Sequence, residues 1–194
     1  MKKLLVVGLL VIATASAFAQ GQVSFNNNGL LPGNPDSIAV FFGDPAAGGH
    51  RLTLGDGAFV AQLWYGPAGS TESALTALTD PPTNFRAATT TLPGTWAAGG
   101  TKTLPGIAEG ATAVLQVRVW DTTKGSTYSA AVTANNGLYT GKSALFNYVA
   151  PPTGSPASAY NMANFTGFIV AVPEPSVIVL GILGASVLLL RRRK

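Results

Sequence analysis

Few side chains in this sequence could support catalysis. Acid–base and nucleophilic chemistry near neutral pH usually needs an imidazole beside a nucleophile, and the chain has one histidine, His50. His50 follows Gly48 and Gly49 in a segment for which we expect a mobile loop, and no Gly-x-Ser-x-Gly sequence supplies a partner nucleophile. We therefore interpret His50 as a solvated loop residue, and the sequence predicts no catalytic residue.

Residues 141–143, with the sequence Gly-Lys-Ser, are similar to the end of a phosphate-binding loop. That motif needs a glycine five positions before its second glycine, and Asn136 occupies this position. We attribute the similarity to chance, so the sequence predicts no nucleotide and no other cofactor.

The acidic side chains leave one alternative open. Two carboxyl groups about 5 to 9.5 Å apart could hydrolyse a glycosidic bond, and Asp121 with either Glu109 or Asp56 is the pair that the sequence offers. Asp44, Asp56 and the asparagines at 26–28 carry oxygens that calcium accepts, but the chain has no Asp-x-Asp-x-Asp-Gly loop. Turn formation explains these residues more simply, so no metal site is predicted.

The tryptophans Trp64, Trp96 and Trp120 are the strongest candidates for a binding surface. An indole face can stack on a sugar ring through apolar contact. Trp64 and Trp120 share their strand faces with polar residues, which favours exposure, whereas Trp96 lies in a turn-rich segment. The sequence leaves open whether these side chains form a binding platform or fill the core, and Trp64 and Trp120 are the candidate ligand-binding residues.

The elements that would position these side chains follow a two-residue period. In residues 113–121, aliphatic side chains alternate with Gln116, Arg118 and Trp120, which predicts a half-buried strand. Residues 58–65 show the same alternation and end at a Gly-Pro pair. Shorter strands are predicted for residues 22–25, 37–42, 143–148 and 165–170.

Many short strands with glycine-, proline- and asparagine-rich turns predict an all-β fold, an antiparallel β-sandwich of the jelly-roll or immunoglobulin-like type. We place the sandwich at residues 20–150, and a last strand with a linker at 151–172. Residues 128–135 could form a short helix, and 70–78 fit either helix or strand. The Leu-Pro-Gly-Thr-Trp stretch at 92–96 imitates the motif of Gram-positive sortases, but we interpret it as a turn.

The N-terminal residues have the three-part layout of a secretory signal peptide, with two lysines, an apolar run at 4–12 and a small-residue stretch. The run is shorter than the ~20 residues of a membrane-spanning helix. It therefore predicts a removable signal peptide at residues 1–19, which would deliver the chain to the Sec translocon. Ala17 and Ala19 fit the cleavage pattern, which leaves Gln20 as the first residue of the mature chain.

The C-terminal residues predict a membrane anchor. An uncharged, mostly apolar stretch at 176–190 would form a single transmembrane helix, and it is short for the ~30 Å hydrocarbon core. Positive charge after such a helix is retained on the cytoplasmic side and stops transfer, so the preceding domain would lie across the membrane. The cationic residues are Arg191, Arg192, Arg193 and Lys194.

Pro173, Glu174 and Pro175 stand immediately before this stretch. A Pro-Glu-Pro motif, a short hydrophobic helix and a terminal arginine cluster, in that order over residues 173–194, resemble the PEP-CTERM sorting signal of Gram-negative bacteria. The resemblance implies an exosortase, a membrane-embedded transpeptidase, as processing partner, with cleavage near the motif. It also implies a link to extracellular polysaccharide and biofilm.

Charge and cysteine content exclude several classes of function. The formal net charge of +4 comes from the two ends, which hold six of the twelve basic residues. Residues 20–172 contain six basic and seven acidic side chains. This part of the chain therefore lacks the basic surface with which a nucleic-acid-binding protein contacts phosphates. The absence of cysteine excludes disulfides, thiolate metal sites and a cysteine nucleophile.

These observations lead to three hypotheses. The first is an exported, non-enzymatic protein of the cell surface or extracellular matrix, structural or adhesive, which passes through an inner-membrane-anchored precursor. The second is a carbohydrate-binding module that uses Trp64 and Trp120 to bind exopolysaccharide. The third is a carbohydrate-active hydrolase that uses Asp121 and a second carboxylate.

Overall fold

The structure is a computed structural model that describes residues 19–27, 35–90 and 92–173. Within these ranges the chain is mostly β, with largely antiparallel sheets and one α-helix, and no helix among them is long and apolar enough to cross a membrane. Most of the predicted signal peptide, Glu174 and Pro175, the predicted helix at 176–190 and the basic residues 191–194 lie outside the described residues.

Four of the described strands have seven to twelve residues, and the other strands have two to four. The strands are β1 (Gln20–Asn26), β2 (Val40–Phe42), β3 (His50–Arg51), β4 (Phe59–Pro67), β5 (Thr76–Ala77), β6 (Thr83–Asn84), β7 (Ala97–Ala108), β8 (Thr112–Asp121), β9 (Thr140–Lys142), β10 (Phe146–Val149) and β11 (Phe168–Val170). The helices are α2 (Tyr128–Ala134) and the 3-10 turns η2 (Pro35–Ile38), η3 (Pro45–Ala47), η4 (Leu54–Asp56), η5 (Glu72–Ala74) and η6 (Ala157–Tyr160).

The largest sheet has six strands and is built on the two strands with the clearest period-two patterns. β4 and β8 pair antiparallel from Phe59 opposite Asp121 to Pro67 opposite Ala113. β10 and β9 extend the sheet beside β8, and β5 and β6 extend it beside β4. Both of these predicted strands are therefore confirmed.

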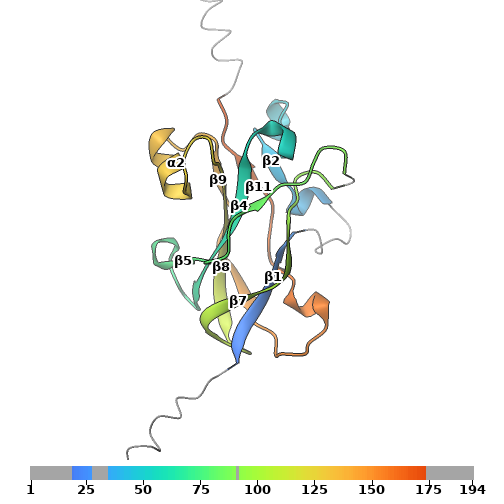
Figure 1. Cartoon of the computed structure of the whole chain (residues 1–194), viewed down its shortest axis with the longest axis vertical. Helices are drawn as coiled ribbons and strands as arrows, with labels where there is room; N and C mark the ends of the chain where they lie inside the picture. The colour runs from blue at the N-terminus through green and yellow to red at the C-terminus, as the bar shows by residue number, and fades with distance from the viewer. Residues whose placement is uncertain (1–18, 28–34, 91, 174–194) are drawn as a thin grey trace, which may run out of the picture.

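The prediction that β8 is half-buried is wrong, because both of its faces are covered. Its inward side chains pack into the main core, and Gln116, Arg118 and Trp120 on the other face are also buried. Helix α2 lies over that outer face, where Ala131 and Tyr128 pack against Trp120 (Figure 1). Alternation reports which side a residue faces, but it does not report that a later segment covers the polar side.

A second sheet, formed by β1 and β7, packs across the main core from the six-stranded sheet. Leu104 and Ile107 of β7 and Val23 of β1 are buried in that core. β7, the longest of the described strands, was not predicted, because glycines and Pro105 interrupt its pattern and its pairing with β1 contains register shifts.

The C-terminal strand β11 joins the remaining sheet to the body. It pairs parallel with β2, and β2 pairs antiparallel with β3. On its other side, Ala171 donates its N–H to the carbonyl of Thr140 at 3.0 Å and accepts from the N–H of Tyr139 at 2.6 Å. The chain thus enters the body at one end, at β1, and leaves at the opposite end, after β11 (Figure 1).

Glycines permit the close approach around β11. A Cβ on Gly167 would lie 2.0 Å from the carbonyl oxygen of Ala39, and one on Gly141 would lie 2.8 Å from that of Ile169. Both distances are shorter than any real Cβ contact, so these positions exclude side chains.

Several predicted elements differ in their bounds. The strands predicted at 37–42, 143–148 and 165–170 begin three residues later than expected, because residues 37 and 38 belong to η2 and residues 143–145 and 165–167 form no regular element. The helix predicted at 128–135 is confirmed as α2, and residues 70–78 contain η5 and β5. Residues 151–164, for which we predicted a linker, contribute buried Tyr160 and Met162 to the fold.

The side chain of Asn27 ties three segments together inside the protein. It is fully buried, accepts from the N–H of Trp96 at 2.9 Å and donates to the carbonyls of Ile38 at 2.8 Å and Gly94 at 3.2 Å. Its bonds to residues 94 and 96 fix the stretch at 92–96, which is a turn as predicted. Trp96 is thereby held at the centre of an aromatic cluster with Phe25, Phe85 and Phe165.

Replacing Asn27 with alanine should lower the free energy of unfolding by about 2 to 4 kcal/mol, because it removes the partner of the buried Trp96 N–H and of the Ile38 carbonyl and leaves the Gly94 carbonyl with its bond from the Val40 N–H alone. Denaturant titration of the Asn27→Ala chain would measure this loss. The exposed Asn164, which makes one hydrogen bond to the carbonyl of Asn147, provides a control, and Asn164→Ala should cost less than about 1 kcal/mol. Equal losses in the two variants would contradict this role for Asn27.

Candidate functional site

The three tryptophans occupy different environments. Trp96 is fully buried and Trp120 is 2% exposed, so the exposure that the sequence favoured for Trp120 is wrong and neither residue offers a face to a ligand. Trp64, on the outer face of β4, is partly exposed. Of the two candidate ligand-binding residues, the structure leaves Trp64 accessible.

Arg118 covers Trp64 on the outer face of the six-stranded sheet. Its guanidinium carbon lies 3.8 Å from the centroid of the Trp64 ring and 5.3 Å from that of Tyr128, distances at which a cation is attracted to an aromatic face. Its Nε donates to the side-chain oxygen of Gln116 at 2.8 Å, and its Nη2 donates to the carbonyl of Glu72 at 3.2 Å. Burial lowers the pKa of Arg118, partly offset by Glu72 and Tyr128, and the group stays charged at neutral pH.

Glu72 balances this buried cation. Its Oε1 accepts from Nζ of Lys142 at 2.6 Å and lies 3.9 Å from Nη2 of Arg118. The hydrogen bond from Lys142 lowers the pKa of Glu72, and this effect outweighs the opposite effect of partial burial. The outer face therefore carries two cations and one carboxylate in direct contact, which we call the outer-face cluster (Trp64, Glu72, Arg118, Tyr128 and Lys142).

A hollow of about 460 Å³ opens beside this cluster. Its walls combine an indole, a guanidinium, a carboxylate and two hydroxyl side chains, and the hydroxyls of Thr71 and Ser73 lie 3.2 Å apart on the exposed rim. Such a mixture can both donate and accept hydrogen bonds beside an apolar surface. The lining residues are Trp64, Thr71, Glu72, Ser73, Leu75 and Arg118.

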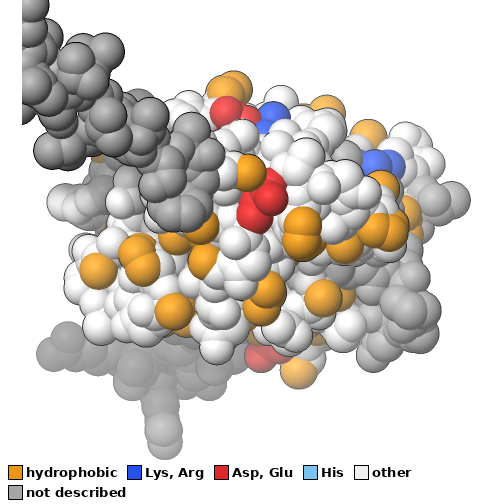
Figure 2. All heavy atoms as spheres, turned by 90° about the horizontal axis from the view of Figure 1, so that it is seen from below, with side chains coloured by type: hydrophobic (Ala, Val, Ile, Leu, Met, Phe, Trp, Pro, Cys, Tyr) orange, Lys and Arg blue, Asp and Glu red, His pale blue; other side chains and the backbone are white. Residues whose placement is uncertain are grey.

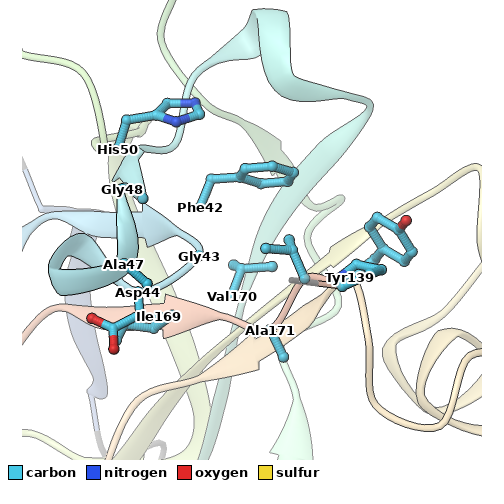
Figure 3. A pocket seen from close by; sticks show the side chains of 13 residues that line it. Phe42, Gly43, Asp44, Ala47, Gly48, His50, Tyr139, Ile169, Val170 and Ala171 are labelled. Carbon is cyan, nitrogen blue, oxygen red and sulfur yellow. The ribbon is translucent and has the colours of Figure 1, made fainter. Parts of the chain in front are cut away.

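A second hollow, of about 560 Å³, lies where the chain leaves the body. Phe42, Tyr139 and Val170 come to it from three separate segments, with Asp44 and His50 at its edge (Figure 3). Its surface is mainly apolar, and Pro173 of the predicted sorting motif is part of the lining.

His50 is hydrogen-bonded to a carboxylate that holds the adjoining turn. It lies in β3 and not in the mobile loop that we expected, and its Nε2 lies 2.7 Å from Oδ1 of Asp56. The other carboxylate oxygen of Asp56 accepts from the N–H and hydroxyl of Thr53. Burial alone would raise the pKa of Asp56, but the hydrogen bonds from His50 and Thr53 lower it below its ordinary value.

One of the two predicted carboxylate pairs is far apart in the structure. In the other pair, both carboxylates accept hydrogen bonds from neighbouring residues. Glu109 precedes β8 and Asp121 ends it, and ten strand residues place the two about 30 Å apart. Asp56 lies at the same end as Asp121, but Asp56 is bound to His50 and Thr53, and Asp121 accepts from the N–H and hydroxyl of Thr123. Glu109 accepts from Thr153. These carboxylates thus hold turns and loops in place.

The Gly-Lys-Ser stretch at 141–143 is part of the sheet, because β9 pairs with β8. Lys142 binds Glu72, and the Ser143 hydroxyl accepts from the N–H of Val117 at 3.0 Å. These bonds account for both side chains without a phosphate.

Charge is thinly spread on the described surface. Seen from below, scattered acidic and basic side chains stand among many uncharged ones, and no cluster of Lys or Arg appears on that face (Figure 2). Among the described residues, no group of three or more His, Cys, Asp or Glu side chains is placed to hold a metal ion.

Comparison with known protein families, with curated proteins and with solved structures finds no match for this chain.

Sequence reasoning found Trp64 but missed its partners. Glu72 lies in the segment left undecided between helix and strand, and it is 46 residues from Arg118 and 70 from Lys142. The one available signal was Arg118 itself, a charged residue in the middle of the strongest strand, which needs a partner when it is covered.

The carboxylate of Glu72 should make stability depend on pH. Because its pKa is lower in the folded state than the ordinary 4.5, its stabilising contribution is complete above that value and is lost as pH falls through the lowered pKa. The free energy of unfolding should therefore fall less steeply between about pH 5 and about pH 3 in Glu72→Gln than in the unaltered chain. At neutral pH the substitution should cost less than about 1 kcal/mol, since the pair is partly exposed.

Lys142→Gln is the matched control, because it removes the main cause of the lowered pKa from the other side and should flatten the pH profile similarly. Parallel pH profiles for the unaltered chain and Glu72→Gln would contradict this assignment.

Proposed function

We propose that this chain is an exported cell-surface or extracellular-matrix protein with a non-enzymatic, structural or adhesive role. In this proposal a removable signal peptide delivers it to the Sec translocon, a C-terminal helix anchors the precursor in the inner membrane, and an exosortase processes the Pro-Glu-Pro region. The body would be a β-sandwich, which the packing of antiparallel sheets around one core supports.

One observation carries this proposal: the folded body fits between the two predicted processing points. β1 begins at Gln20, the residue that signal cleavage after Ala19 would make the first. At the other end, β11 closes with the Ala171 backbone bonds, two residues before Pro173. Removal of both targeting segments at these points would therefore leave every described strand intact.

The arrangement of polar groups supports a non-enzymatic role. His50 and Asp56 bind each other, and Asp121 and Glu109 each hold a threonine. The catalytic pair that the hydrolase hypothesis requires is either too far apart or committed to turns, so we do not propose hydrolysis.

Carbohydrate binding is the second candidate function, and the hollow beside Trp64 favours it. The hollow combines an aromatic side chain with hydrogen-bonding groups of both kinds, the composition that sugar hydroxyls and their apolar ring faces require. Trp120 has no part in this proposal, because α2 covers it.

The basic residues at 191–194 should decide where the precursor stops. Replacing all four with glutamine removes the charge that retains a helix end in the cytosol, so the altered chain should lose membrane retention in fractionated cells.

Mass spectrometry of the mature unaltered protein should find Gln20 at its N-terminus and no residue of 191–194 at its C-terminus. A mature surface protein that keeps these four residues would refute processing, and a cytosolic chain that keeps residues 1–19 would refute export.

A further inference from the structure

We infer that the hollow beside Trp64 binds an uncharged glycan, and that Arg118 and Glu72 together bind neighbouring hydroxyl groups of one sugar ring. This inference rests on the adhesive function proposed above and names the ligand class of its binding site.

Arg118 and Glu72 present a donor and an acceptor side by side at the hollow. A guanidinium has five N–H donors in a rigid fork, and Gln116 and the Glu72 carbonyl engage two of its nitrogens. The Glu72 carboxylate lies 3.9 Å from the guanidinium and can accept several hydrogen bonds. A hydroxyl group both donates and accepts, so adjacent hydroxyls on one ring match this pair.

The position of Glu72 favours an uncharged ligand over an acidic one. Its carboxylate already lies against both Lys142 and Arg118. A carboxylate on the ligand would have to displace Glu72 or lie beside it, where like charges repel. A hydroxyl group meets neither obstacle.

Trp64 positions the site more than it forms a platform. The guanidinium of Arg118 lies 3.8 Å from the Trp64 ring centroid, so that face of the indole is unavailable for a sugar. The stack instead holds the planar guanidinium in one orientation, which reduces the entropy lost when a ligand binds. Leu75 and the remaining indole surface provide the apolar wall.

The rim gives a polymer access. Thr71, which immediately precedes η5, and Ser73 within η5 are exposed at the edge of the hollow. A substitution there can fill the hollow without disturbing a buried group, which makes Ser73→Leu a blocking variant that should keep the fold.

Affinity electrophoresis of the full chain, in a detergent without a sugar headgroup, tests this inference. The gels contain hydroxyethyl cellulose, dextran or galactomannan as uncharged polymers, or alginate or polygalacturonate as acidic ones. At least one uncharged polymer should retard the unaltered chain. Glu72→Gln should weaken that retardation about tenfold, equivalent to ~1.4 kcal/mol for a charge-assisted hydrogen bond, and Ser73→Leu should abolish it.

Glu109→Gln is the matched control, because it removes the same charge at the far end of β8, where Glu109 binds Thr153. It should leave retardation unchanged, and all three variants should keep the unfolding midpoint of the unaltered chain at neutral pH within a few degrees.

Each other outcome overturns the inference in a distinct way. Retardation that survives in both Glu72→Gln and Ser73→Leu places the glycan elsewhere and leaves the adhesive function standing. Retardation confined to alginate or polygalacturonate refutes the uncharged class. If none of the polymers retards the chain, glycan binding is refuted altogether. The export proposal is tested separately, by mass spectrometry of the mature N- and C-termini.

Discussion

The pairing of β11 on both of its edges is the contact on which the rest of the structure depends. On one side β11 forms a parallel pair with β2, and on the other Ala171 exchanges two hydrogen bonds with residues 139 and 140. Without β11, no other described strand would connect the sheet of β2 and β3 to the six-stranded sheet. Because β11 is the last described strand, the fold can close only after residues 20–171 have reached the same compartment. The proposed export therefore has a physical corollary: the body must cross the membrane before it completes its core.

The outer face of the six-stranded sheet differs chemically from the face that packs into the core. The inward face is apolar, whereas Arg118 on the outward face brings a cation into a largely covered position. Removing a charge from water is expensive unless it is paired and hydrogen-bonded, and the surrounding side chains meet that requirement through Gln116, Glu72 and two aromatic rings. Replacing such a group with an apolar residue would often be neutral or favourable for stability. Its presence at a hollow is consistent with a role in binding.

Sequence patterns predicted the elements that depend on consecutive residues. They did not predict the features that depend on contacts between distant segments. The alternation in β4 and β8 and the short helix α2 were readable because each depends on a few consecutive residues. β7 could not be predicted, because glycines and Pro105 interrupt the two-residue alternation of its side chains. Its register is set by pairing with β1, about eighty residues earlier. The exposure of Trp120 was mispredicted because α2 follows it in the chain and folds back over it. For the site, the sequence indicated Trp64 but could not bring Glu72 and Lys142 to Arg118, since sheet pairing and a loop make that contact.

We propose that one nearly neutral, cysteine-free body lies outside the cytosol between two cationic ends. Because the chain has no cysteine, Ala134→Cys, on the exposed end of α2, supplies a single thiol on the surface of the body. We predict that a membrane-impermeant maleimide labels this thiol in intact Gram-negative spheroplasts as fully as it does after lysis. Labelling that appears only after lysis would place the body in the cytosol and contradict the account.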